Sequence, residues 1–184
     1  MIILASKSSR RIELLKDAGL SFEVIPSNIN EKADENLTPI ENAMHLAELK
    51  ATDVYTKYPN SLVIAADTIV TLNNKIYGKP KTKENAILML KELRGKKHDV
   101  ITGVAIIYQN KKEVFYSKSS VVIKDLTDEE IINYVQTKEP LDKAGAYAIQ
   151  GIGKDIVETY EGDFLTIVGL PLKEVLTKIK EIKK

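Results

Sequence analysis

Residues 5–11 (ASKSSRR) bring three serines and two arginines together between an apolar run and an amphipathic stretch. This pattern predicts a strand over residues 2–4, a tight turn and a helix over residues 12–18. Free backbone N–H groups and the positive end of a helix dipole favour an anion at such a turn, and arginine adds bidentate donors that suit phosphate oxygens. The alternative is that Ser8 or Ser9 only caps the helix while the arginines face solvent.

Residues 142–151 (DKAGAYAIQG) form a second candidate ligand-binding segment. Its small residues would let the backbone approach a ligand closely, Tyr147 would form a wall, and the Gln150 amide can both donate and accept hydrogen bonds. The alternative is that Gln150 only ties the loop to its own backbone.

Acidic and basic residues between these two segments complete the candidate set. Asp67 follows the apolar residues 62–66, so we expect it at the carboxyl end of a buried strand, where open α/β sheets bind ligands; otherwise it caps a turn. Glu31 lies in a polar loop and by itself predicts only a solvated side chain. Lys50 shares a helix face with apolar residues and either extends to water or points into a cleft. Lys79 places a cation on a loop that the following proline stiffens.

Several cations with a few acids are what a metal–polyphosphate site requires. The cations offset phosphate charge, and the carboxylates hold the metal and deprotonate water. The chain has no cysteine, which excludes disulfides, thiol catalysis and zinc–thiolate sites. Because its only histidines, His45 and His98, are far apart in sequence, any metal should be a hard cation held by carboxylates. As the cofactor we expect a divalent cation, Mg²⁺ or Mn²⁺.

The hydrophobic pattern predicts helices and strands that alternate along the chain. Residues 38–57 begin with a capping box and repeat apolar residues at helical spacing. Further helices are predicted after Thr82, after Thr127 and from Pro171. Strands are predicted over residues 21–25, 62–66, 68–72, 75–77, 100–108, 114–123 and 156–159. Helices that alternate with both parallel-type and hairpin strands indicate an α/β fold with a mixed sheet.

Length and composition limit the class of protein. A chain of 184 residues suits a single domain over residues 1–184, divided into two lobes around a cleft. The net charge of +1 argues against a broad electrostatic footprint for nucleic acid. We find neither a signal peptide nor an apolar stretch of membrane-spanning length, and so expect a cytoplasmic protein without a membrane partner.

Short motifs in order from residue 4 to about residue 172 resemble those of the Maf (septum-formation-inhibitor) nucleoside triphosphate pyrophosphatases. The motifs are residues 5–11, Lys50-Ala51, Ala66-Asp67-Thr68, Gly78-Lys79-Pro80, Thr102-Gly103, residues 144–147 and residues 149–151. The resemblance implies a Maf/ITPase-like α/β fold, with flanking helices and two lobes around a deep cleft. It also implies hydrolysis of a nucleotide to a monophosphate and diphosphate.

The same resemblance assigns roles to individual residues. Asp67 matches the family's general base, and Glu31 matches an acid that belongs, with Asp67, to the metal site. The positions that match phosphate-binding residues are Ser6, Arg10, Arg11, Lys50 and Lys79.

Substrate choice is also implied by the resemblance. Arg11, Thr68 and Gln150 match positions linked to specificity, and residues 148–151 resemble the dTTP/UTP branch rather than the branch that acts on 7-methyl-GTP. Ser9 stands where the family usually has proline. Since serine can still begin a helix, we expect slightly looser turn geometry without loss of function.

The sequence therefore predicts a metal-dependent nucleoside triphosphate diphosphatase with a small-molecule nucleotide substrate, dTTP and UTP first. By family resemblance we expect a homodimer. One alternative is a nucleotide-binding regulator of cell division with little turnover. Another is the same enzyme class with a modified purine or pyrimidine nucleotide as substrate. Nucleic-acid binding is the weakest alternative, because the charge is balanced and aromatic residues make up only 6%.

Overall fold

The structure is a computed structural model that describes residues 1–184, and the chain divides into two compact units. The first unit contains Met1–Asp67, Thr102–Ser117 and Gly169–Lys184. The second unit contains Thr68–Ile101 and Lys118–Val168.

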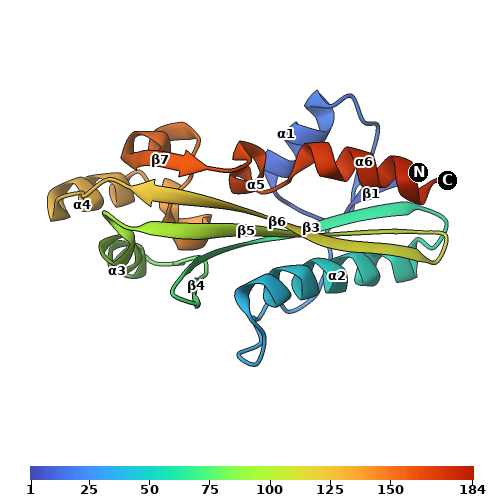
Figure 1. The fold of residues 1–184 in the computed structure, drawn as a ribbon, viewed down its shortest axis with the longest axis horizontal. Coiled ribbons are helices and arrows are strands. Elements are labelled where there is room, and N and C mark those ends of the chain that lie inside the picture. Colours follow the sequence, from blue (N-terminus) through green and yellow to red (C-terminus); the bar gives the residue numbers. More distant parts are fainter. The chain divides into compact units, whose positions relative to one another are not determined.

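The strands form a seven-stranded mixed sheet in the hydrogen-bonded order β2-β1-β3-β5-β6-β7, with β4 paired to β3 (Figure 1). The strand bounds are β1 Ile2–Leu4, β2 Glu23–Val24, β3 Leu62–Leu72, β4 Lys75–Tyr77, β5 Lys97–Tyr108, β6 Lys111–Ile123 and β7 Val157–Glu161. β1 runs parallel to β2 and β3, whereas β3 is antiparallel to β4 and β6 is antiparallel to β7. The α/β class and the mixed sheet predicted from the sequence are confirmed.

Side-chain caps explain where several helices begin. The helix bounds are α1 Ser9–Asp17, α2 Pro39–Lys57, α3 Lys83–Leu93, α4 Asp128–Gln136, α5 Phe164–Val168 and α6 Leu172–Ile182. Thr38 and Thr127 form the predicted capping boxes of α2 and α4, which satisfy backbone N–H groups that have no partner within the helix. The Thr82 hydroxyl accepts a hydrogen bond from the backbone of α3, as predicted.

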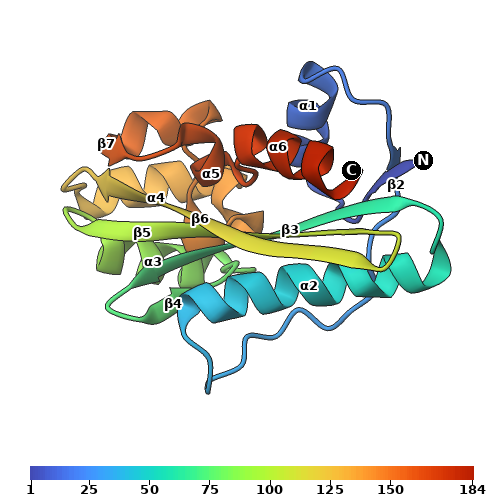
Figure 2. The same cartoon turned by 45° about the vertical axis from the view of Figure 1, so that its right-hand side comes forward.

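In the first unit, α2 covers one face of the strands, and α1 and α6 cover the other (Figures 1 and 2). The apolar cluster on the α2 side contains Ile3, Ala5, Ala47, Ala51, Val54, Val63, Ala65, Ala105 and Ile107. The cluster on the other side contains Leu4, Leu15, Leu62, Ile64, Ala66, Val104, Ile106, Leu170, Val175, Ile179 and Ile182. Alternate residues of each strand thus enter opposite clusters, as the period of two in a strand requires.

The second unit contains three short 3₁₀-helices that the sequence analysis did not predict. They are η1 Glu139–Asp142, η2 Ala144–Ala146 and η3 Gly151–Ile156. The five-residue helix α5 was also missed. Elements this short contain at most about two turns, which is too few for a hydrophobic period to be recognised.

Several strand bounds differ from the predictions. β3 is continuous over residues that were predicted as two strands, and β2 is only two residues long. The β5–β6 connection is shorter than predicted, because Gln109 and Asn110 both adopt positive φ and close it in two residues.

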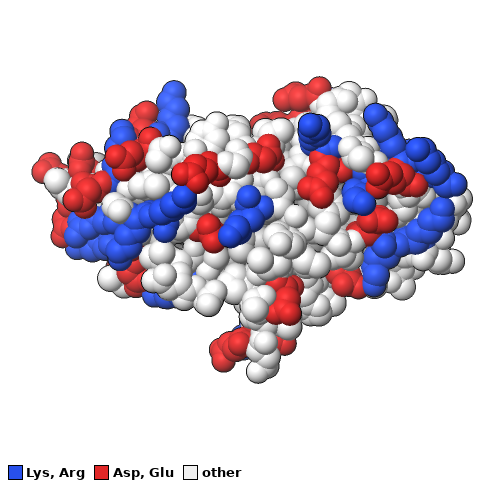
Figure 3. Space-filling model, viewed as in Figure 1, with Lys and Arg blue, Asp and Glu red and all other residues white.

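Basic and acidic side chains are interspersed on the face drawn in Figure 3. Exposed ion pairs of the chain include Lys57 with Asp53 and Lys97 with Glu161. Such pairs contribute little to stability because solvent screens them. None of the helices combines the length and apolar composition needed to cross a membrane.

Candidate active site

Lys50 of α2 lies between two carboxylates of the first unit. Its Nζ is 2.7 Å from Asp67 Oδ1 and 2.9 Å from Glu31 Oε2, and its side chain is only 7% exposed. Lys50 shares the buried stripe of α2 with Ala43 and Ala47, so its aliphatic stem lies against the sheet. Of the two alternatives for Lys50, extension to water is wrong: the ammonium group is directed at the acids.

Asp67 projects from the middle of β3 rather than from its end. β3 continues beyond Asp67 to Leu72 and pairs there with β4. Residues 68–72 (TIVTL) are rich in β-branched side chains, which favour the extended backbone even where a charged residue interrupts the apolar run. The prediction that Asp67 ends its strand is therefore wrong, and so is the turn-capping alternative. Strand alternation places Asp67 on the same face as Val63 and Ala65, toward α2, where it meets Lys50.

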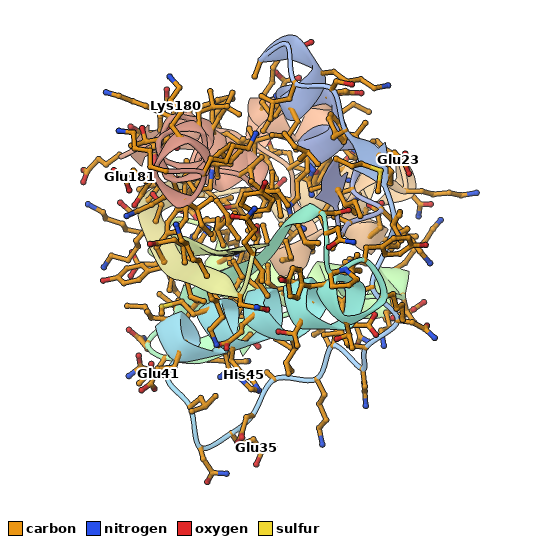
Figure 4. The ribbon with its side chains drawn as sticks, turned by 90° about the vertical axis from the view of Figure 1, so that its right-hand side faces the viewer. Glu23, Glu35, Glu41, His45, Lys180 and Glu181 are labelled. Carbon is orange, nitrogen blue, oxygen red and sulfur yellow. The ribbon has the colours of Figure 1, made fainter.

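Glu31 lies on the loop between β2 and α2, which passes along α2 in Figure 4. Two contacts with α2 flank it. The Asn28 backbone N–H donates to Asp53 Oδ2 at 2.8 Å, and the Asp34 N–H donates to the Asn42 side-chain oxygen at 2.8 Å. These anchors hold the loop against the helix on both sides of Glu31, which keeps the half-exposed carboxylate within reach of Lys50.

Arg11 is buried and bonds to the protein itself. Its Nε donates to Gly169 O and its Nη1 to Ala66 O, both at 2.8 Å, and Nη1 also lies 3.3 Å from Ser6 Oγ. Burial lowers the pKa of Arg11, and the negative charge of Asp67 opposes that shift. For Arg11, the alternative that the arginines face solvent is therefore wrong. Arg11 links the turn after β1 to the residue that precedes Asp67.

The turn before α1 provides no side-chain cap for the backbone N–H groups at the start of the helix. Ser8 occupies the N-cap position, but its side chain makes no capping hydrogen bond. Its backbone N–H instead donates to Ser6 Oγ at 3.2 Å. α1 begins at Ser9, so serine in the place of proline still starts the helix. Arg10 is half-buried on the first turn.

Glu31 and Asp67 are the residues of this site that suit a metal ion. No group of three histidine or acidic side chains is placed to hold a metal. Mg²⁺, however, is often bound by one or two carboxylates together with substrate phosphate oxygens. These two carboxylates already converge on one cation, the ammonium group of Lys50. The donor set therefore fits a hard divalent cation whose other ligands are phosphate oxygens.

Three predicted site residues belong to the second unit. Thr68 is half-buried on β3, and Lys79 is exposed on the loop between β4 and α3. The Gly145 N–H donates to Gly78 O at 3.2 Å, so the loop that carries Lys79 is joined to η2. Gln150 is exposed directly before η3, and its side chain does not cap that helix.

Tyr147, which we expected to form a wall of a ligand site, is buried. Its hydroxyl lies 2.7 Å from His98 Nε2, and the two rings make an edge contact with centroids 5.4 Å apart. His98 Nδ1 lies 3.2 Å from Lys96 O, which can only accept, so Nδ1 donates and Nε2 accepts from Tyr147. Burial raises the pKa of Tyr147 and lowers that of His98, which keeps both groups neutral.

The sequence analysis also missed two residues that hold the segment around Gln150. The Glu139 carboxylate accepts hydrogen bonds from the backbone N–H groups of Ile152 and Gly153, and Tyr134 donates its hydroxyl to the same carboxylate. Only the closeness of Glu139 in sequence to residues 142–151 could have pointed to it, because the loop groups that it binds are backbone N–H groups, which no side-chain pattern marks.

The fold places the chain with the α/β proteins built like Ham1. The Staphylococcus aureus Ham1 protein matches with a TM-score of 0.53 at 18% identity, over 100% of this chain and 99% of that one. At this identity the likeness shows the fold alone.

The chain belongs to the Maf family, because it matches the description "Maf-like protein" over residues 1–182. Similar relatives carry the name dTTP/UTP pyrophosphatase. The relative from Caldicellulosiruptor bescii is 52% identical over 93% of this chain and 89% of its own length. That from Caldicellulosiruptor saccharolyticus is 48% identical over 98% of this chain and 94% of its own, and that from Acholeplasma laidlawii 48% over 98% and 96%. The predicted family is thus confirmed.

Proposed function

We propose that this protein hydrolyses dTTP and UTP to the monophosphate and diphosphate. The names of its relatives agree with the function predicted from the sequence. The structural observation that carries the proposal is the position of Lys50 between Asp67 and Glu31. The buried ammonium group can bind a phosphate chain, and a carboxylate beside it can accept a proton at the same site.

Asp67 is the general base of the proposed reaction. Its carboxylate takes a proton from water, whose oxygen attacks the α-phosphorus. The bond between that phosphorus and the bridging oxygen breaks, and diphosphate leaves with the electron pair. Lys50 donates to Asp67 at 2.7 Å and fixes the direction of the carboxylate, which supports this assignment because a base must be oriented as well as ionised.

The cations and the start of α1 stabilise the charge that develops on the phosphates. Ser6, Arg10, Lys50 and Lys79 would contact the triphosphate, aided by the N–H groups that the Ser8 side chain leaves uncapped. Arg11 would also contact phosphate, as the resemblance implies. Its Nε and Nη1 already donate to Gly169, Ala66 and Ser6, so it would hold the turn in place as well.

Glu31 and Asp67 would hold the divalent cation, Mg²⁺ or Mn²⁺, together with phosphate oxygens. When bound, the cation supplies charge neutralisation and orients water. Lys50 would then share its two acidic partners with the incoming cation.

Thr68 and Gln150 would select the nucleobase. Arg11 would contribute through the backbone that it holds. The Gln150 amide can pair with the adjacent acceptor and donor of uracil or thymine, whereas cytosine presents an unprotonated ring nitrogen and an amine. Because the Gln150 side chain is exposed and caps no helix, its amide is available to a ligand. The protein would act as a homodimer on the cytoplasmic nucleotide pool.

Turnover of UTP in H₂¹⁸O with Mg²⁺ tests both the bond and the metal. Attack at the α-phosphorus places ¹⁸O in UMP, whereas attack at the β-phosphorus places it in diphosphate, and mass spectrometry distinguishes the two. Excess chelator should abolish the reaction. Orthophosphate as the first product, or undiminished turnover with chelator, would contradict the proposal. Nucleotide binding without any turnover would favour the regulator instead.

A further inference from the structure

The segment that carries Gln150 is held by a carboxylate after this residue and by a hydroxyl before it. After Gln150, Glu139 Oε2 accepts from Gly153 N at 2.8 Å and Oε1 accepts from Ile152 N at 3.1 Å. Before Gln150, Tyr134 Oη accepts from Ala148 N at 3.3 Å. We call Glu139 and Tyr134 the clasp.

The two members of the clasp are joined to each other and to α4. Tyr134 Oη donates to Glu139 Oε2 at 2.8 Å, and the Tyr134 ring is buried in the second unit. The Glu139 N–H donates to Thr137 Oγ1 at 3.2 Å, just beyond the end of α4. The clasp therefore fixes residues 148–153 relative to a helix whose start is secured by a capping box.

Two glycines show how closely the loop packs on the clasp. A Cβ added to Gly151 would lie 2.3 Å from Glu139 Oε1, and Gly151 has a φ of +66°. A Cβ added to Gly153 would lie 2.6 Å from Tyr134 Oη and 2.2 Å from Ala148 O. A side chain at Gly153 would clash with backbone, and one at Gly151 would displace the Glu139 carboxylate at a positive φ, so the loop backbone lies directly against the clasp.

We propose that Glu139 is a positioning residue for substrate selection: through the backbone of residues 148–153 it sets where the Gln150 amide meets the base. This rests on the role proposed above for Gln150. Hydrogen bonds from N–H groups to an ionised carboxylate are short and strong, and a loop held by several of them keeps one geometry. A carboxylate that only stabilised the fold would affect all nucleotides equally.

The test compares Glu139→Gln with Glu129→Gln, a matched change at an exposed position on the first turn of α4. The amide of Glu139→Gln keeps the size of the side chain but offers only one acceptor oxygen to three donors. Hydrogen exchange of peptides over residues 148–154 should accelerate about tenfold. This factor corresponds to the free energy of one lost hydrogen bond to a charged group. The kcat/KM ratio of UTP to CTP should fall about as much, through a higher KM for UTP with kcat nearly kept. Glu129→Gln should change neither quantity.

Two further variants make each outcome decisive. Tyr134→Phe removes the hydroxyl that bonds both Ala148 and Glu139, and should move exchange and selectivity in the same direction if Glu139→Gln does not fold. Gln150→Ala reports on the underlying assignment. If Gln150→Ala lowers the UTP-to-CTP ratio while Glu139→Gln and Tyr134→Phe leave it at the wild-type value, the clasp proposal is overturned and the proposed function stands. If Gln150→Ala itself leaves the ratio unchanged, the role of Gln150 falls, and the clasp proposal with it.

Discussion

Lys50 compensates the charges of Asp67 and Glu31 from within the protein. Lys50 and Asp67 are both buried, so neither charge has bulk water to replace its partner. Removing one member of such a group leaves the other uncompensated, which costs more than the pair itself contributes.

Lys50→Met should therefore lower the free energy of unfolding by about 3 kcal/mol. The matched change on the same helix, Lys57→Met, breaks only the exposed pair with Asp53 and should cost less than about 1 kcal/mol. Urea unfolding measures the loss in both variants.

If Glu31 and Asp67 are metal ligands, Mn²⁺ should raise the melting temperature of Lys50→Met more than that of the wild type. An equal response to Mn²⁺ in the two proteins would remove that support for the metal site.

Asp67→Asn keeps the shape of the side chain but cannot take a proton from water. We expect kcat for UTP to fall by about 10²- to 10⁴-fold, the usual contribution of a general base. Nucleotide binding, measured by calorimetry, should be affected less, because Arg10, Lys50 and Lys79 remain. Glu35→Gln, in the exposed part of the loop before α2 (Figure 4), is the control and should retain wild-type turnover. A wild-type kcat in Asp67→Asn would move the base elsewhere, with Glu31 the next candidate.

At the scale of elements, α2 approaches β5 so closely that one strand position admits only glycine. A Cβ added to Gly103 would lie 2.3 Å from the backbone carbon and oxygen of Ala43 on α2. Gly103→Ala must push the helix that carries Lys50 away from the sheet, and we expect a loss of about 2–3 kcal/mol. Gly78→Ala has open space around it and should be near neutral. Equal stability of the two variants would show that α2 can shift at little cost.

The contact between β5 and the loop after η2 depends on a neutral histidine. Burial lowers the pKa of His98 below its ordinary value of about 6.5, so below that pH the unfolded chain binds more protons than the native protein. The contribution of neutral His98 to the free energy of unfolding is fully present above about pH 6.5. It decreases as the pH falls toward the pKa of His98 in the native protein. Urea unfolding at pH 7.5 and 5.5 should show this loss in the wild type and a smaller one in His98→Gln. Identical losses in both proteins would assign the pH dependence to other groups.

At the scale of the whole molecule, β3, β5 and β6 each contribute residues to both compact units. A strand cannot easily lose order in one half while keeping it in the other. We therefore expect one cooperative unfolding transition over residues 1–184, in line with the single domain predicted from the sequence. Far-UV circular dichroism and tyrosine fluorescence should give the same urea midpoint. Two separate midpoints would show that the units unfold independently.

The sequence by itself determined most helices and strands, because caps and periodicity act over a few residues. Thr38, Thr82 and Thr127 begin helices as predicted, and the alternating apolar residues place the strands. The order of motifs also determined the family, which needs no coordinates. Local signals failed where an element was short, as for α5, or where a charge interrupted a strand, as at Asp67.

Only the tertiary structure decided which side chains meet. Asp67 meets Lys50 because β3 continues through it and directs it toward α2, and Glu31 joins them because two backbone contacts with α2 hold its loop. The inward position of Arg11 and the clasp at Glu139 likewise depend on backbone acceptors and donors far away in the chain. Such contacts carry no sequence signal, since every residue type offers the same backbone groups and only the fold brings a particular one within reach.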